Sequence, residues 1–284
     1  MGKVQIGPFL KDYNNAVIEF VKSEGIEQDL ERFELARKIL KRFSRFPYEN
    51  LSKIIKLNRD FNGLPHRLPE EIIEDNLKYN LGGTCFSLTF FLKKIFDYFK
   101  FDTYIIMADM RYAKNSHTAL ILNYNGNKYL LDPGYLIFDP IPLDKEVKRT
   151  SILTQLLKYD ENSDRYSLWT FDGKRMVFRY SFRDSPIAFE EFIFYWTDSF
   201  HWRTMHGICL TKMDNDRFIY FHNRYYKIID KNKKEKGNIQ TDIAGAIKSV
   251  FGIPTDIIFK AEKALAENLF YDKRLGLKVP KWVK

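Results

Sequence analysis

Cys85 is the residue of this sequence best placed to act as a nucleophile. It directly follows Gly82, Gly83 and Thr84, and an apolar run with helical spacing begins at the cysteine itself. The unpaired N–H groups and the dipole at a helix start stabilise a thiolate, and the glycines let a backbone or a substrate approach the sulfur. A buried structural thiol fits the same position, so a catalytic role requires partners elsewhere in the chain.

A histidine and an aspartate that could serve as these partners lie on a predicted β-hairpin. Asn125 and Gly126 favour a two-residue turn, because both central positions of that turn require positive φ. Counting back along the ladder places Asp132 opposite Ala119 and makes His117 its diagonal neighbour on the same face, about 7–8 Å away at the backbone. A carboxylate there would fix the tautomer of the imidazole and stabilise its charged form. Taken singly, the histidine also fits a satisfied strand residue and the aspartate a turn former.

Short segments spread along the chain resemble motifs of the arylamine N-acetyltransferases. They are FPYENL at 46–51, GGTCF at 82–86, SHTAL at 116–120 and YLLDPGY at 129–135, and a weaker similarity continues through Ser199 and Phe200. These segments are similar to the family's Pro-Phe-Glu-Asn-Leu, Arg-Gly-Gly-x-Cys-Phe, Thr-His-x-x-Leu and Tyr-Leu-Val-Asp-Val-Gly-Phe. They fall in the family's order, the resemblance covers most of the chain, and the set is specific.

The resemblance implies an enzyme, an arylamine N-acetyltransferase with a ping-pong reaction. In this family a cysteine takes the acetyl group from acetyl-CoA, the co-substrate, and passes it to an arylamine, an arylhydrazine or an N-hydroxyarylamine. Carried over to this sequence, Cys85 is the nucleophile, His117 is the base and Asp132 orients the base. The implied partner is therefore a small-molecule aromatic amine or hydrazine acceptor, and no metal is required.

The resemblance also implies an α+β fold made of three parts. Residues 1–100 would form an N-terminal helical bundle carrying the nucleophile, 101–200 a central antiparallel β-barrel carrying the histidine and aspartate, and 201–284 a C-terminal α/β lid. The triad arrangement would be related to that of cysteine proteases and transglutaminases. Residue spacing independently predicts helices at 14–22, 30–43, 69–77, 85–96, 242–250 and 256–265. It also predicts strands at 103–107, 166–171, 175–182, 207–212 and 217–221, in addition to the hairpin at 117–131.

Two sets of residues are expected to contact substrates. In the family the loop after the aspartate approaches the thioester cofactor, and its residues here are Gly134, Tyr135 and Leu136. Aromatic side chains that could line an acceptor pocket are Phe46, Tyr48 and Phe200, and ordinary core packing is the competing interpretation for each of them.

The sequence departs from the family pattern close to this site. Leu81 stands in place of the arginine before Gly-Gly, while Glu49 is retained, so any polar bracing between the two segments must differ here. Pro133 replaces a valine, and Leu136 stands where the family has a second glycine. A branched side chain at that position could narrow the approach of CoA.

Length and composition indicate a globular protein. The chain has 284 residues, of which 45% are hydrophobic and 16% aromatic, enough for a sizeable core. It shows neither a long apolar run nor a secretory signal, which predicts a cytoplasmic location without membrane contact. The only other cysteine, Cys209, lies far from the first in sequence and fits a small buried hydrophobe. The net charge of +9 comes from basic residues spread along the chain, and we expect no nucleic-acid partner.

Two other functions fit the same residues. A thiol-triad amide synthase, or a transglutaminase-like or hydrolytic enzyme, would keep the triad with a different acyl donor, and Leu136 favours this alternative. A non-catalytic binding protein on the same scaffold would fit the altered Leu81, Pro133 and Leu136, although retention of all three triad residue types argues against it.

Overall fold

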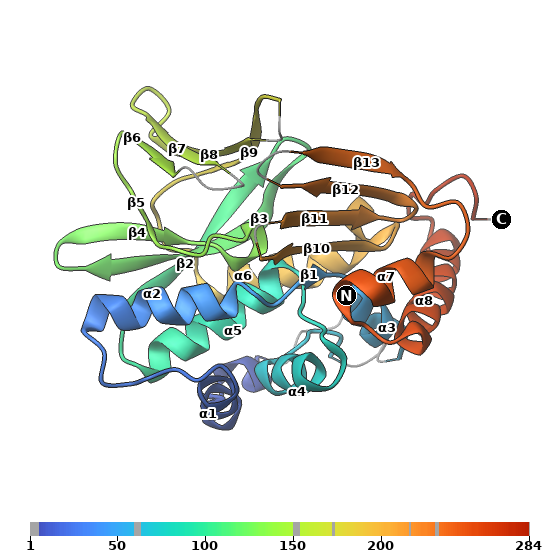
Figure 1. Cartoon of the computed structure of the whole chain (residues 1–284), viewed down its shortest axis with the longest axis horizontal. Coiled ribbons are helices and arrows are strands. Elements are labelled where there is room, and N and C mark those ends of the chain that lie inside the picture. The colour runs from blue at the N-terminus through green and yellow to red at the C-terminus, as the bar shows by residue number, and fades with distance from the viewer. Residues whose placement is uncertain are drawn as a thin grey trace.

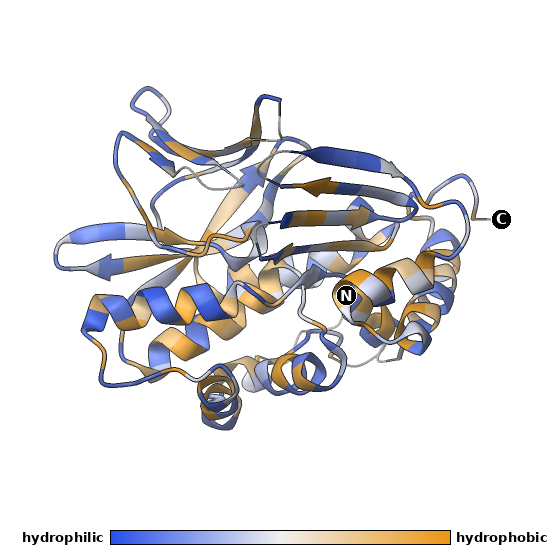
Figure 2. Cartoon of the chain, viewed as in Figure 1, coloured by the Kyte–Doolittle hydropathy of each residue, from blue (hydrophilic) through white to orange (hydrophobic). Residues whose placement is uncertain are grey.

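Helices form the first part of the chain and surround one central helix. The computed structural model describes residues 6–59, 64–149, 154–171, 174–215, 217–230 and 233–283. The early helices are η1 (Gly7–Leu10), α1 (Asn14–Ser23), α2 (Arg32–Phe43), α3 (Leu51–Arg59), α4 (Pro69–Tyr79) and α5 (Cys85–Tyr98). Most of α5 is buried, because α1, α2 and α4 contact it together with two strands, and Figure 2 shows it as largely hydrophobic. A helix that is apolar on most of its surface belongs in a core.

An antiparallel barrel follows the helices. Its strands are β2 (Asp102–Met110), β3 (Ala113–Tyr124), β4 (Asn127–Leu131), β5 (Ile141–Pro142), β6 (Glu146–Arg149), β7 (Gln155–Asp160), β8 (Arg165–Phe171) and β9 (Met176–Phe182). They pair in the order β5-β4-β3-β2-β9-β8-β7-β6, and β5 and β6 are the edges that leave the barrel nearly closed (Figure 1). The predicted α+β class with a central barrel is confirmed.

The β3–β4 hairpin has the predicted turn. Asn125 and Gly126 have φ of 49° and 75°, and the pairing runs from Tyr124↔Asn127 to Leu120↔Leu131 as counted from the sequence. The register is the predicted one, but the ladder stops one pair before the predicted pairing of Ala119 with Asp132. The ladder ends at Leu131 because Pro133, which has no N–H, starts the short helix η2 (Pro133–Tyr135).

A second antiparallel sheet joins the two ends of the chain. It contains β1 (Tyr48–Glu49), β10 (Cys209–Asp214), β11 (Arg217–His222), β12 (Tyr225–Ile229) and β13 (Lys234–Asn238), in that order. Along the chain, α6 (Phe189–Asp198), η3 (Ser199–His201) and η4 (Arg203–Met205) come between β9 and β10. The last helices are α7 (Ile243–Phe251) and α8 (Thr255–Arg274), and α8 packs on α3. The segment FPYENL therefore lies beside the C-terminal part of the chain, through β1.

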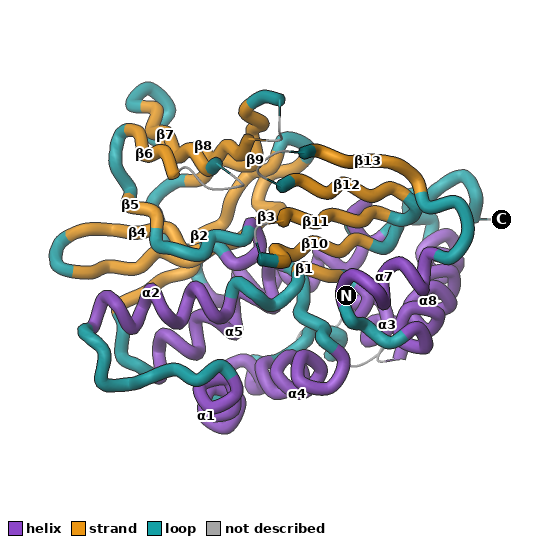
Figure 3. The backbone as a smooth tube through the Cα atoms, viewed as in Figure 1, coloured by secondary structure: helices purple, strands orange, loops and turns teal. Residues whose placement is uncertain are grey.

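One hydrophobic core serves all these elements. The buried apolar residues form a cluster from Phe9 to Val283, so helices and strands share their packing, with the strands above the helices in Figure 3. A division of the chain near residues 100 and 200 stays a prediction. Of the helices in the described residues, none combines the length and apolarity needed to cross a bilayer.

Candidate active site

Two glycines hold the segment before Cys85 tightly against the FPYENL segment. The N–H of Gly83 donates to Pro47 O at 3.3 Å, and the N–H of Glu49 donates to Gly83 O at 3.0 Å. A β-carbon at Gly82 would lie 2.0 Å from Pro47 O, a distance that no side chain tolerates. The chain then enters α5 at Cys85, whose side chain is buried and lines a cavity.

His117 and Asp132 meet on the barrel wall beside this helix. Nε2 of His117 lies 2.7 Å from Oδ2 of Asp132, and both side chains are buried. Because an ionised carboxylate only accepts hydrogen bonds, Nε2 carries the proton and Nδ1 is left as the ring nitrogen for Cys85. A β-carbon at Gly134 would lie between 3.2 and 3.4 Å from atoms of all three residues. The structure therefore brings together Cys85, His117 and Asp132.

Two tyrosines fix the carboxylate from other directions. Oη of Tyr180, on β9, donates to Oδ2 of Asp132 at 2.7 Å, and the N–H of Tyr135 donates to Oδ1 at 3.1 Å. Burial raises the pKa of Tyr180 well above its ordinary value, so its hydroxyl stays a donor. The Tyr180 ring also packs against His117, with ring centroids 4.7 Å apart. Asp132 is thus held on both oxygens before any substrate arrives.

The charged form of His117 is favoured in this setting. Burial acts to lower the pKa of His117, but the charge and hydrogen bond of Asp132, followed by those of Cys85, raise it to about 10. An imidazole with this preference can take up the thiol proton of Cys85 and keep it, which leaves the sulfur as a nucleophile.

A cavity of about 470 Å³ opens at these residues. Gly134, Tyr135 and Leu136, expected in the cofactor loop, all line it. Leu136 has φ of 54°, the left-handed conformation that strains a branched residue and suits the glycine found there in the family.

The three aromatic residues expected at an acceptor pocket lie in different places. Tyr48 lines the cavity, as does Trp202. Phe46 is buried in the core, where it stacks on Phe43 with centroids 5.1 Å apart. Phe200 is also buried, and its ring faces Nζ of Lys53 rather than the cavity wall. Of the three, only Tyr48 is positioned by this structure to touch a substrate in the cavity.

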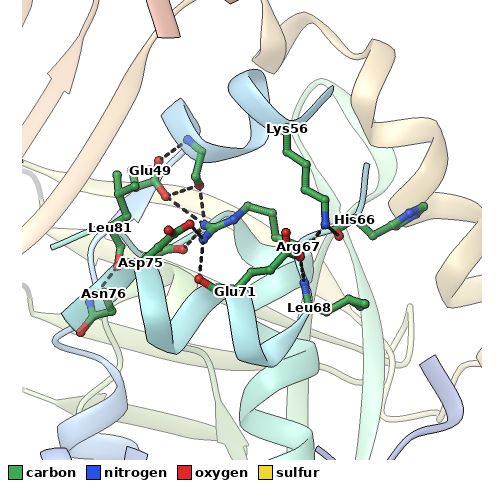
Figure 4. A network of polar contacts seen from close by, with 11 residues as sticks. Glu49, Lys56, His66, Arg67, Leu68, Glu71, Asp75, Asn76 and Leu81 are labelled. Atoms are coloured by element: carbon green, nitrogen blue, oxygen red, sulfur yellow. Dashed lines mark hydrogen bonds and ion pairs between the residues drawn. The ribbon is translucent and has the colours of Figure 1, made fainter. Parts of the chain in front are cut away.

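A buried guanidinium anchors the segment before the nucleophile (Figure 4). Nη1 of Arg67 donates to Gly82 O at 2.7 Å and to Ser52 Oγ at 2.5 Å, and Nη2 donates to Asp75 at 2.6 Å. Oε1 of Glu49, which is fully buried, lies 3.6 Å from Nη1. The charge opposite Glu49 therefore comes from the loop before α4.

Arg67 replaces the arginine that the family has at the position of Leu81. The side chain of Leu81 is apolar and buried at the position where the family has arginine. Arg67, fourteen positions earlier in the sequence, reaches both the retained Glu49 and the glycine segment. The polar bracing between the two segments is therefore present, with its cation supplied from another part of the chain.

Several polar residues near the site were not identified from the sequence. Tyr180 and Arg67 depend on partners far along the chain, and the sequence carries no local signal for either contact. Lys53 lines the cavity from α3, a helix that the sequence analysis did not predict. A lysine in the first turn of a helix is opposed by the helix dipole. Had α3 been predicted, this unfavourable position would have marked Lys53 as a residue with a special role. Within the described residues, no group of His, Cys, Asp and Glu side chains is arranged to hold a metal ion.

Solved structures that share this fold are arylamine N-acetyltransferases. The enzyme from Mycobacterium abscessus has a TM-score of 0.74 and 17% identity, over 88% of this chain and 94% of that chain. The enzyme from Bacillus anthracis has a TM-score of 0.69 and 21% identity, over 84% and 98%. An enzyme from Bacillus cereus, described as having a unique Cys-His-Glu catalytic triad, has a TM-score of 0.67 and 18% identity, over 84% and 99%. The chain therefore has the fold of the arylamine N-acetyltransferases.

A family model described as N-acetyltransferase matches residues 30–258. Because this match spans most of the sequence, the chain belongs to the N-acetyltransferase family, and the predicted class of enzyme is confirmed. No curated protein sequence matches the chain significantly.

Proposed function

We propose that this enzyme moves an acetyl group from acetyl-CoA to the nitrogen of an aromatic amine or hydrazine through an acetylated Cys85. The observation that carries the proposal is the His117–Asp132 pair, 2.7 Å apart, held beside a helix-start cysteine in one cavity. Family membership supports acetyl transfer, and the solved relatives are named for arylamines. The Bacillus cereus relative has a carboxylate as third triad member, the role that we give to Asp132.

In the first half of the reaction Cys85 becomes acylated. Its proton passes to Nδ1 of His117, and the sulfur attacks the carbonyl carbon of the thioester. As the tetrahedral intermediate collapses, the carbon–sulfur bond to CoA breaks and His117 returns the proton to the leaving thiolate. Burial lowers the pKa of His117, but Asp132 and Cys85 raise it to about 10. The imidazole therefore holds the proton until the thiolate of CoA leaves.

In the second half the acceptor removes the acyl group. The amine nitrogen attacks the carbonyl carbon of acetyl-Cys85 and gives up its proton to His117, and the carbon–sulfur bond breaks to regenerate the thiolate. Asp132 holds the imidazole in one tautomer through both halves, because Tyr180 and the Tyr135 N–H keep the carboxylate in place.

The cavity suits the two substrates in turn. Tyr48 and Trp202 offer aromatic surface to a planar amine. Arg179 and Lys227, both partly exposed, line the same cavity and add positive charge that favours the phosphates of CoA. Leu136 is the one lining residue that opposes CoA, because it puts a branched side chain where the family has none.

The experiment that tests this proposal mixes the purified enzyme with acetyl-CoA alone. We expect CoA release in a single burst and an acetyl adduct that maps to Cys85 and is absent from Cys85→Ala. If acetyl-CoA leaves the protein unmodified while another acyl thioester or a peptide amide acylates Cys85, the donor is different and the amide synthase or transglutaminase-like alternative replaces the proposal. If no donor modifies Cys85, the chain is not an acyltransferase of this type.

A further inference from the structure

A buried lysine shares the cavity with Cys85. Lys53 lies in the first turn of α3, is only 5% exposed and lines the cavity. Its Nζ donates to the carbonyl oxygen of Ser199 at 3.1 Å and to Ser199 Oγ at 2.6 Å, and lies 4.4 Å from the centre of the Phe200 ring. These contacts hold the ammonium group in one place and use two of its three N–H groups.

No aspartate or glutamate of the described residues pairs with the ammonium of Lys53, and the negative charge that acts on it is that of Cys85. Its direct contacts are neutral groups, namely a carbonyl, a hydroxyl and an aromatic face, and no aspartate or glutamate of the described part of the chain lines the cavity. A buried cation is normally paired. This one is paired with dipoles that orient it without cancelling its charge.

Stability does not account for a lysine at this position. Burial lowers the pKa of Lys53 to about 7, although the charge of Cys85 acts to raise it. Folding therefore disfavours the charged form of the lysine. The positive end of the α3 dipole acts against a cation as well. A methionine would fill the same space without either cost, so the charge of the lysine is better explained by an anion in the cavity, either the sulfur of Cys85 or a group of the substrate.

The rest of the cavity points to the same kind of ligand. Besides the Cys85–His117 pair, its ionisable lining includes the basic residues Lys53, Arg179 and Lys227 and, among the described residues, no aspartate or glutamate, and aromatic walls accompany them. Arg179 and Lys227 are partly exposed, whereas Lys53 is buried in the same cavity as Cys85. We therefore expect an anion bound to Lys53 to be part of the group that reacts at Cys85. The phosphates of CoA would instead lie near Arg179 and Lys227, which are partly exposed.

We propose that Nζ of Lys53 binds a carboxylate on the molecule that reacts at Cys85, so that the enzyme selects carboxylated substrates. This inference rests on the proposed acyl transfer and names its substrate class. The carboxylate could be carried by the aromatic amine acceptor or by the acyl chain itself, since both occupy the space beside the sulfur. In either case the substrate carboxylate supplies the counter-ion that no aspartate or glutamate lining the cavity provides among the described residues, and it accepts a hydrogen bond from Nζ of Lys53.

The test compares matched charged and neutral substrates. For the acceptor, kcat/KM is measured with 4-aminobenzoate and with 4-aminobenzamide, which differ mainly in charge. For the acyl chain, the rate of Cys85 acylation is measured with succinyl-CoA and butyryl-CoA. Each pair is run with the unaltered enzyme, with Lys53→Gln, which keeps a donor for Ser199 without the charge, and with Lys53→Met. Lys263→Met serves as the control, because it removes the charge of a lysine whose side chain is 81% exposed and pairs only loosely with Glu267, at 3.9 Å.

We expect both Lys53 variants to lower the rate for the charged member of one pair by about ten- to hundredfold, as for loss of a charged hydrogen bond. The neutral member of that pair, and the Lys263→Met enzyme, should stay within about threefold. The pair affected identifies the source of the carboxylate. Equal effects on charged and neutral members of both pairs would overturn the proposal.

Binding without turnover separates this inference from the proposed function. Thermal unfolding of the unaltered enzyme and of Lys53→Gln is recorded with 4-aminobenzoate, 4-aminobenzamide, succinate and butyramide. Stabilisation of the unaltered enzyme by the carboxylate of a pair over its neutral counterpart, lost in Lys53→Gln, supports the site even if no acyl transfer is found. The absence of any preference, in an enzyme that does acylate Cys85, refutes the Lys53 site alone.

Discussion

Replacement of Arg67 by methionine should destabilise the enzyme more than any loss of a surface ion pair. Arg67 is 3% exposed, and its guanidinium donates to Ser52, Gly82, Asp75 and the carbonyl of Glu71. The variant leaves the buried Glu49 carboxylate without its cation and the Gly82 carbonyl without a donor.

The expected size follows from the burial of these groups. Removal of one partner from a buried ion pair costs about 3–5 kcal/mol. A domain typically has only about 5–15 kcal/mol of stability, so the loss is a large fraction of the total. At about 2–4 °C for each kcal/mol in a chain of this size, the unfolding temperature should fall by roughly 10 °C.

Arg37→Met provides the matched control. Arg37 also pairs with two carboxylates, Glu34 and Asp139, each at 2.7 Å, but it is 44% exposed. Exposed pairs of this kind contribute about 0–1 kcal/mol. Thermal and urea unfolding of the two variants therefore compare the same chemical change in buried and exposed positions.

A double variant tests whether the stranded charge is the cause. Glu49→Gln removes the carboxylate that Arg67→Met leaves uncompensated, so the two changes together should cost less than the sum of their separate costs. If Arg67→Met is no more harmful than Arg37→Met, Arg67 does not brace this region as described, and if the two costs simply add, Arg67 does not compensate the charge of Glu49.

Three further predictions concern the site and its surroundings. Asp132→Asn should lower kcat by about 10³-fold or more with the unfolding temperature nearly unchanged, because the imidazole loses its fixed tautomer; an unchanged rate would remove Asp132 from the mechanism. Leu136→Gly should relieve the strained φ of 54° and lower KM for acetyl-CoA, and a raised KM would show that the leucine aids the donor. Burial, with the charges of Lys53 and Lys56, lowers the pKa of His66 to about 3. The unfolded chain therefore takes up a proton below about pH 6.5 that the folded chain refuses, and stability should fall by up to ~1.4 kcal/mol per pH unit from there towards pH 3. His66→Phe should be less acid-sensitive in urea unfolding, and an equal slope would refute this cause.

The features that the sequence predicted well depend on local interactions. Asn125 and Gly126 define their turn through their own φ preferences, so the β3–β4 register could be counted. Residue periodicity located α5, and the glycines before it marked its start. The closeness of His117 and Asp132 followed from that register, although Pro133 ends the ladder one residue early.

The features that were missed depend on contacts between distant segments. Lys53 and Ser199 are 146 positions apart, and Tyr180 reaches Asp132 only because β9 pairs with β2 in the barrel. The helices α3 and α6 were not predicted from the sequence. In α3, Lys53 and Lys56 are buried by partners from elsewhere, so the spacing of its apolar residues alone understated the buried face.

The central claim is that His117 and Asp132 make the sulfur of Cys85 an anion, and differential alkylation tests it most directly. Iodoacetamide is added at pH 7, and modification of Cys85 and Cys209 is followed by peptide mass mapping. Burial raises the pKa of Cys209 to about 12, so it serves as an unreactive internal reference. We predict that Cys85 reacts at least about a hundredfold faster than Cys209, and that His117→Ala removes most of this difference. Similar rates for the two cysteines, or a Cys85 rate that is unaffected by loss of His117, would contradict the account.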